Sequence, residues 1–333
     1  MRKALIAAAI CALASRQAWG QVSQAIALEI GWENCVSYVD DLTDPTRRAT
    51  SPGMVSARVS PARTFNPSMT IADIVSVNGQ PAKGFLVIRL NTLSMTPNAA
   101  SGGAIGDRGN GAVGTVDMEI LQADGTPVGS IMSQGIILGA APPGAPRTGL
   151  THNMTISGGT GAFLGARGML TSPATAVGCR YASMEEAPAN RRTHGGDRGR
   201  FIAYLIPAIR PEILSNGGAP AVVHASDFTL VSASRPAAPG EILSLYATGL
   251  GPTRPGLELG SPFRSQPLHE VNSPLEVFVN GRAAEVLAAV GNPGSVDAYQ
   301  VNFRVPGDTP PGMATLQVSA AWVTGAEVRI AVR

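Results

Sequence analysis

The chain has 333 residues, of which 39 are glycine, 26 are proline and 14% are charged. This composition excludes a coiled coil or a long helical bundle, because glycine and proline weaken helix interiors, and a hydrophobic fraction of 44% excludes full disorder. The formal net charge of +2 falls to about −1 when Arg2, Lys3 and Arg16 are set aside, so no positive field is expected to attract nucleic acid.

Residues 1–20 have the layout of a secretory signal peptide. Arg2 and Lys3 precede an apolar run, and an Ala-Trp-Gly sequence ending at Gly20 supplies the small residues of a cleavage site. We predict export to the periplasm or the extracellular space, with a mature chain that begins at Gln21. The apolar run is too short to remain as an anchor, and no later run approaches the roughly 20 residues of a transmembrane segment.

The first half of the mature chain has the pattern of an all-β protein. Apolar and polar residues alternate in short runs that are separated by turn residues. Asn78-Gly79 and Asp124-Gly125 each separate two such runs and predict β-hairpins, because a type I′ turn needs residues that tolerate positive φ. Such runs occupy residues 26–30, 71–77, 84–93, 116–121, 128–138, 150–157, 164–171, 175–181 and 200–206.

These runs are enough to close an eight-stranded antiparallel barrel over residues 25–209, and a sandwich is the alternative. Cys35 and Cys179 are the two cysteines left after signal removal. In an exported protein they predict a disulfide, and two separately buried thiols are the alternative. The bridge would close a loop of about 145 residues, which the chain-entropy model values at roughly 4 to 5 kcal/mol.

The second half starts a new pattern after a segment rich in proline and glycine at residues 207–220. Seven short runs in about 120 residues fit an immunoglobulin-like β-sandwich over residues 212–333. Asn280-Gly281 predicts one of its hairpins. The runs occupy residues 221–232, 241–248, 275–279, 284–289, 298–305, 314–320 and 327–332.

Gly158, Gly159, Thr160 and Gly161 have the composition of a phosphate-binding loop, because glycines let backbone amides approach an anion. The context does not fit a nucleotide site, since no Gly-Lys-Ser/Thr sequence follows and the next run has the pattern of a strand. We therefore interpret these four residues as a tight turn between two barrel strands, with the glycines at positive φ.

The segment 154–168, Met-Thr-Ile-Ser-Gly-Gly-Thr-Gly-Ala-Phe-Leu-Gly-Ala-Arg-Gly, resembles the Gly-Gly-Thr-Gly-x-Phe-x-x-Ala-Arg-Gly segment of dirigent and allene oxide cyclase-like barrels. Asp40-Asp41-Leu-Thr is similar to an acidic segment near the start of dirigent proteins. The resemblance implies an eight-stranded barrel with an apolar central cavity. Those families use the cavity to bind a small hydrophobic molecule and to steer its cyclisation or coupling.

The same resemblance makes three charged residues candidates for a pocket. Arg167 would face the cavity and polarise an oxygen of the ligand, or it would pair with a carboxylate at the barrel rim. Asp40 and Asp41 are either acid-base groups of a cyclase or turn residues that bind their own backbone. Asp117 and Glu119 share one face of a predicted strand, as an acid-base pair or as part of a solvated outer face.

The second half resembles an uncharacterised C-terminal domain of exported soil-bacterial proteins. The resemblance rests on residues 239–252, 277–281 and 299–306, and the first of these segments is also similar to the opening of IPT/TIG immunoglobulin-like modules. It implies a fold and no activity.

No metal site and no cofactor are predicted, because the four histidines are far apart and no Cys-x-x-Cys sequence is present. A Gly-x-Ser-x-Gly elbow is also missing, so an α/β-hydrolase is not supported. A local basic cluster is open to two interpretations, contact with polysaccharide or anionic lipid, or a solvated loop. The histidines are His152, His194, His224 and His269, and the basic cluster is Arg191, Arg192, Arg198 and Arg200.

These observations predict an exported two-domain all-β protein whose barrel binds a small apolar ligand. If it is an enzyme, it is a cofactor-free cyclase or isomerase that restricts the conformation of its substrate. The alternative is a non-catalytic protein that contacts a cell surface or an extracellular matrix through loops 97–114, 140–149 and 185–199, and a hydrolase with dispersed catalytic residues is a third hypothesis. A cavity inside the barrel favours the first, and a filled barrel with an exposed apolar patch favours the second.

Overall fold

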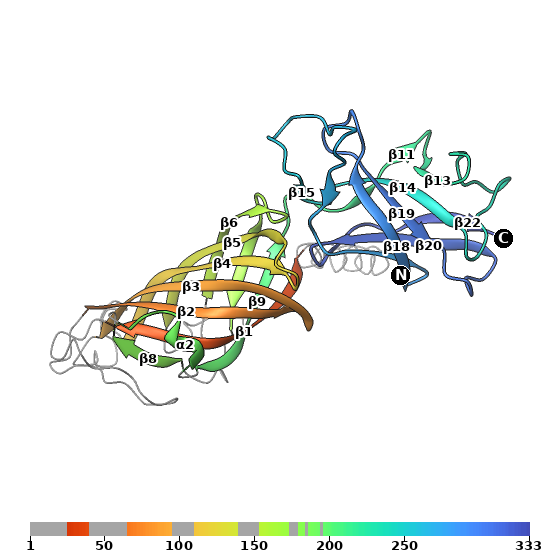
Figure 1. The fold of residues 1–333 in the computed structure, drawn as a ribbon. Helices are drawn as coiled ribbons and strands as arrows, with labels where there is room; N and C mark the ends of the chain where they lie inside the picture. Colours follow the sequence, from red (N-terminus) through yellow and green to blue (C-terminus); the bar gives the residue numbers. More distant parts are fainter. Residues whose placement is uncertain are drawn as a thin grey trace, which may run out of the picture.

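The computed structural model describes residues 25–39, 65–94, 110–138, 153–172, 179–183, 186–193 and 196–333. The expected signal peptide at 1–20 and the candidates Asp40 and Asp41 lie outside these ranges. The described chain forms a β-barrel followed by a second β-sheet (Figure 1). Its one helix in these ranges is the single turn α2 (Asn190–Thr193), so the all-β prediction is confirmed.

The first part is a closed barrel of eight antiparallel strands. Strands β1 to β7 pair in sequence order, β7 pairs with β9, and β9 pairs with β1 to complete the circle. This confirms the predicted barrel, and closure leaves no unpaired sheet edge along the circle. The strands are β1 (Ile26–Val39), β2 (Phe65–Val77), β3 (Gln80–Ser94), β4 (Asn110–Gln122), β5 (Pro127–Leu138), β6 (Asn153–Gly161), β7 (Arg167–Thr171) and β9 (Asp197–Ile206).

Local turn chemistry places two of the barrel hairpins where the sequence predicted them. Asn78 and Gly79 join β2 to β3 with φ values of 50° and 75°, as a two-residue turn of this type requires. The β4–β5 turn contains Asp124, whose carboxylate accepts a hydrogen bond of 2.8 Å from the amide of Thr126. Gly125 in the same turn has a φ of 94°.

The barrel interior is filled by side chains. Alternate residues of each strand point inward, and in the described strands these positions form one contiguous apolar cluster. Eight strands give an interior that side chains can fill or that can hold one small ligand. In the described strands the inward side chains form a core, which gives no support for the central cavity that the family resemblance implied. Its largest fully buried members include Leu28, Ile30, Ile74, Leu86, Met118, Ile120, Ile131, Met154, Ile156 and Phe201.

The two ends of the barrel differ. The turns after β2, β4 and β6 and the chain segment after β9 lie at the end that faces the second sheet, which we call the closed end (Figure 1). Strands β1, β3, β5 and β7 end at the opposite side, where β2, β4, β6 and β9 begin. We call this second end the mouth.

A disulfide fastens an extra strand outside the barrel circle near the mouth. Cys35 of β1 is bonded to Cys179, which confirms the predicted bridge. The residues that follow form β8 (Arg180–Ser183), which pairs in parallel with the mouth half of β1. Ala182 packs there against the buried Val36 and Tyr38. The segment after the bridge is thus held on the outer side of β1.

The second part is a sheet that curls on itself around a core of its own. Its strands follow the order β10–β14–β19–β18–β17–β20–β21, and β18 is the turning point because its first residues pair with β17 and its later residues with β19. Asn280 and Gly281 turn the chain between β17 and β18 with φ values of 49° and 74°, as predicted. The strands are β10 (Glu212–Ile213), β11 (Ser215–Asn216), β12 (Ala219–Pro220), β13 (Val222–His224), β14 (Ile242–Thr248), β15 (Thr253–Arg254), β16 (Glu270–Val271), β17 (Leu275–Val279), β18 (Arg282–Gly291), β19 (Tyr299–Arg304), β20 (Gly312–Ala320), β21 (Val323–Thr324) and β22 (Val328–Val332).

Candidate functional site

The glycine-rich segment is mainly the end of a strand. Gly158, Gly159, Thr160 and Gly161 are the last residues of β6, and each pairs with a residue of β5. The predicted turn begins only at the last two of them: Gly161 has a φ of 59°, and the amide of Phe163 donates a hydrogen bond of 3.1 Å to the carbonyl oxygen of Thr160. Gly159 is required by close strand pairing, because a Cβ there would lie 2.5 Å from the carbonyl oxygen of Ser130.

Arg167 does not face the barrel interior. It is the first residue of β7, at the closed end, and its side chain is exposed. Its guanidinium donates hydrogen bonds to the carbonyl oxygens of Ser157 and Ala166, the latter at 3.1 Å. Arg167 thus braces the backbone around the β6–β7 turn.

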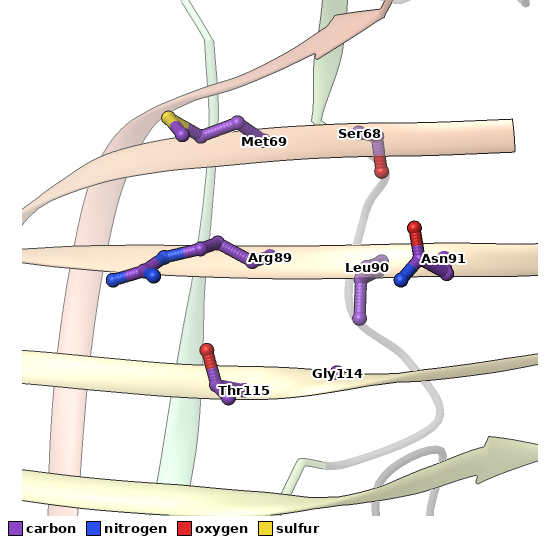
Figure 2. A pocket seen from close by; sticks show the side chains of 7 residues that line it. All are labelled: Ser68, Met69, Arg89, Leu90, Asn91, Gly114 and Thr115. Atoms are coloured by element: carbon purple, nitrogen blue, oxygen red, sulfur yellow. The ribbon is translucent and has the colours of Figure 1, made fainter.

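A hollow of about 360 Å³ lies in the barrel wall near the mouth (Figure 2). Three neighbouring strands contribute to it, each close to its mouth end: β2, β3 and β4. Its volume falls in the range of small-molecule sites. The lining residues are Ser68, Met69, Arg89, Leu90, Asn91, Gly114 and Thr115.

Strand register explains why these residues meet. Met69 pairs with Arg89, and Arg89 pairs with Thr115, which places the three in one row across the outer face of the wall. Leu90 and Gly114 pair in the next row, at positions that point inward. Figure 2 shows Leu90 directed toward Gly114. A Cβ at Gly114 would lie 2.8 Å from Leu90 Cδ2, so glycine is what lets the leucine lean across.

The hollow carries one cation in a loose ion pair. Arg89 lies 3.5 Å from Asp117, and the two side chains are 65% and 35% exposed. Thr115 donates a hydrogen bond of 3.3 Å to the same carboxylate. An exposed pair of this length contributes about 0 to 1 kcal/mol, so the Arg89 guanidinium is available to a polar group of a ligand. Asp117 and Glu119 lie on the outer face, in agreement with the second of the two interpretations above.

Buried charges hold the extra segment beside β1. Arg180 donates two hydrogen bonds to Glu186, at 3.0 and 2.5 Å, and the side chains are 0% and 1% exposed. Tyr38 lies near this pair, and burial, followed by the charge of Glu186, raises the pKa of its hydroxyl. Such a doubly hydrogen-bonded pair fixes the position of the segment that carries it.

The predicted basic cluster is partly neutralised by carboxylates. Arg191 and Arg192 both bind Asp73, at 2.5 and 2.9 Å. Arg200 pairs with Glu29 at 3.2 Å. Two carboxylates thus pair with three of the four arginines of the cluster and offset half of its positive charge.

Asp73 is expected to make the fold sensitive to acid. Burial alone would raise the pKa of its carboxyl, but hydrogen bonds from Arg192, Arg191 and Asn34 outweigh burial and lower the pKa. The charged form therefore stabilises the fold at pH values above the ordinary carboxyl pKa of about 4, and this stabilisation is lost as the pH falls through the lowered pKa. Asp73→Asn is expected to reduce the loss of stability between pH 7 and pH 3 in urea unfolding.

The control for this prediction is Glu258→Gln, which changes an exposed carboxylate in a loop of the second sheet. Glu258→Gln should lose as much stability between pH 7 and pH 3 as the wild type does. An Asp73→Asn variant with the wild-type acid sensitivity would contradict the assignment.

The histidines of the second sheet have structural partners. His224 lies 2.6 Å from Glu241 through Nδ1, and His269 Nδ1 lies 2.7 Å from the carbonyl oxygen of Pro255. His152 and His194 lie outside the described residues. Within the ranges that the structure describes, no three His, Cys, Asp or Glu side chains gather as a metal site would require, and no helix is long and apolar enough to cross a membrane.

Comparisons with known proteins give no family. No family model matches the sequence, and no curated protein matches it. One solved structure, the N-terminal domain of the Streptococcus gordonii adhesin Sgo0707, is similar at 10% identity over 94% of this chain and 95% of that chain, with a TM-score of 0.20. A likeness at this TM-score carries no information on the fold or the function.

The sequence contains no motif that marks the residues of the hollow. Met69, Arg89 and Thr115 are far apart in the chain and belong to no recognisable motif. The register of the Asn78-Gly79 hairpin would by itself place Met69 opposite Ile88. The register shift between Asp73 and Ser76 moves the pairing by one residue and brings Met69 opposite Arg89, so the hairpin sequence provides no signal for this pair.

Proposed function

We propose that the protein is an exported binding protein that takes a small apolar or amphipathic molecule at the hollow near the barrel mouth. The observation that carries the proposal is the hollow itself, which has Met69 and Leu90 as apolar lining and a guanidinium, Arg89, held by a loose ion pair. Apolar lining with a few polar groups that orient the guest is typical of small-molecule sites.

Binding without turnover fits this site better than a cyclase. A cyclase must enclose its substrate to restrict the reacting conformation and to exclude water. The described interior of the barrel is filled, and Arg89 and Asp117 stand on the outer face in contact with solvent. Arg167 lies at the opposite end of the barrel.

We also propose a family likeness for the barrel, a second domain for the curled sheet, and export of the chain. A closed eight-stranded barrel and the Gly-Gly-Thr-Gly-x-Phe segment at the end of β6 support a place near the dirigent and allene oxide cyclase-like barrels. The separate apolar core of the curled sheet supports a second domain over residues 212–333 with an immunoglobulin-like arrangement. The disulfide supports export, because such bonds persist in oxidising compartments.

Filling the hollow is expected to weaken binding of an apolar probe. In Thr115→Trp the indole would occupy the hollow from the outer row, and the affinity for 8-anilinonaphthalene-1-sulfonate should fall about tenfold or more, as a loss of about 1.4 kcal/mol implies. The matched control is Thr155→Trp, on the exposed face of β6 in the same cross-strand row. Fluorescence titration measures both, and equal affinities for the wild type and Thr115→Trp would contradict the proposal.

Contact with a cell surface or matrix is the second candidate, and one observation favours it. Phe85, Val113 and Met132 are 46%, 58% and 43% exposed on the outer face of β3, β4 and β5. These three side chains share one wall with the polar Asp117 and Glu119, and each would give a partner surface a separate apolar contact. In the same titration, loss of probe binding in Phe85→Ser together with normal binding in Thr115→Trp would assign probe binding to these exposed side chains and not to the hollow.

A further inference from the structure

The hairpin between β20 and β21 has an unfavourable turn. Ala320 pairs with Val323, so Ala321 and Trp322 alone form the turn, with φ values of 50° and 61°. Positive φ at both positions is the geometry of a type I′ turn, which favours Asn-Gly. Side chains with a Cβ adopt it at a cost, and such residues persist where the surrounding structure holds them.

The chain uses the favourable dipeptide in two comparable hairpins. Asn78-Gly79 and Asn280-Gly281 make two-residue turns with φ values between 49° and 75°. The Ala321-Trp322 turn therefore lacks the Asn-Gly dipeptide that this chain has in two turns of the same geometry. The pairing of β20 with β21 does not explain why Ala and Trp occupy the turn.

The surroundings of the turn do account for it. Ala321 is 2% exposed and belongs to the apolar cluster of the barrel, not to the cluster of its own sheet. Trp322 also packs against the barrel cluster. The amide of Ala321 donates a hydrogen bond of 3.0 Å to the carbonyl oxygen of Pro274, which ties the turn to its neighbouring loop.

Further contacts place this turn at the closed end of the barrel. Gln122, at the end of β4, donates a hydrogen bond of 2.5 Å to the carbonyl oxygen of Asn272. Gly251 faces the β6–β7 turn, since a Cβ there would lie 3.2 Å from the Cβ of Ala162. Figure 1 shows the second sheet against this end, opposite the mouth.

We propose that the Ala321–Trp322 turn is a plug that seals the closed end of the barrel. The apolar tip of the second sheet completes the barrel core, in the same apolar cluster as Phe163 and Ala166, which are 2% and 1% exposed. The second sheet is then a structural part of the barrel rather than an appended module.

The test replaces the turn by the dipeptide that its geometry favours, in the chain 21–333. Ala321→Asn with Trp322→Gly relieves the positive-φ strain but removes the apolar tip from the barrel end. A plug predicts that the barrel unfolds at a lower temperature, by roughly 5 °C or more. Fluorescence of Trp32, which is 6% exposed in the barrel core, reports this transition. Trp322→Phe keeps an apolar ring and should stay within about 2 °C of the wild type.

An unchanged or higher barrel transition in the double variant would overturn the proposal, because it would mean that only local turn strain matters. A second measurement covers a double variant that does not fold. In Trp32→Phe, Trp322 is the single tryptophan after residue 20. A plugged Trp322 should be protected from acrylamide several-fold relative to the unfolded chain in urea, whereas equal quenching in the two states would overturn the proposal.

Discussion

Replacing Glu186 by Gln is expected to lower the free energy of unfolding by about 3 to 5 kcal/mol. The carboxylate of Glu186 and the guanidinium of Arg180 are 1% and 0% exposed and share two hydrogen bonds. Neutralising the acid removes the carboxylate charge that pairs with the buried Arg180 guanidinium, and a low-dielectric surrounding makes this costly. Urea unfolding followed by far-UV circular dichroism measures the change.

Two controls separate a buried pair from ion pairs in general. Glu270→Gln breaks an exposed ion pair, in which the side chains of Glu270 and Arg254 are 65% and 66% exposed. This substitution should lower the free energy of unfolding by less than about 1 kcal/mol. The double replacement Arg180→Met with Glu186→Leu removes both charges and should be less destabilising than Glu186→Gln alone. A Glu186→Gln variant no less stable than Glu270→Gln would contradict the prediction.

Removing the disulfide is expected to destabilise the protein by about 2 to 5 kcal/mol. The bridge between Cys35 and Cys179 spans 144 residues, and without it the unfolded chain gains conformational entropy. The same bond anchors the start of β8 on the barrel wall. The urea midpoint of Cys35→Ala with Cys179→Ala, compared with the wild type, measures the loss.

Reductant provides the control for the disulfide. It should lower the midpoint of the wild type toward that of the double variant and leave the double variant unchanged. Intact mass after alkylation gives an independent check: labelling of both sulfurs without reductant would contradict the bridge.

The features that follow from short stretches of sequence were predicted correctly. Asn78-Gly79 and Asn280-Gly281 marked hairpins because a type I′ turn selects these residues whatever surrounds them. Alternation over many short runs predicted a closed barrel, since inward positions must be apolar and an open sheet of that size would expose edges. Two cysteines in a chain expected to be exported were enough to predict their bond.

The features that depend on strand packing were missed or misplaced. The alternation of residues along the strand shows that Arg167 and its neighbours point to opposite faces of the barrel wall. It does not show which of the two faces is the interior, and the structure places Arg167 on the outer face. The glycines at 158–161 were assigned to a turn because positive φ and close strand approach select the same residue. The Arg180–Glu186 pair is buried where the segment that follows the disulfide packs against β1, which no local pattern indicates.

Two features, the hollow near the mouth and the Ala321–Trp322 turn, arise only in the tertiary structure. The hollow exists because the register of three strands brings Met69, Arg89 and Thr115 into one row, and no single segment contains that information. Ala321 and Trp322 are unfavourable in a two-residue turn with positive φ at both positions, so the local sequence does not indicate the turn that forms there. Local composition specifies turns and faces, whereas contacts between distant segments decide which faces are buried and which strained turns are held.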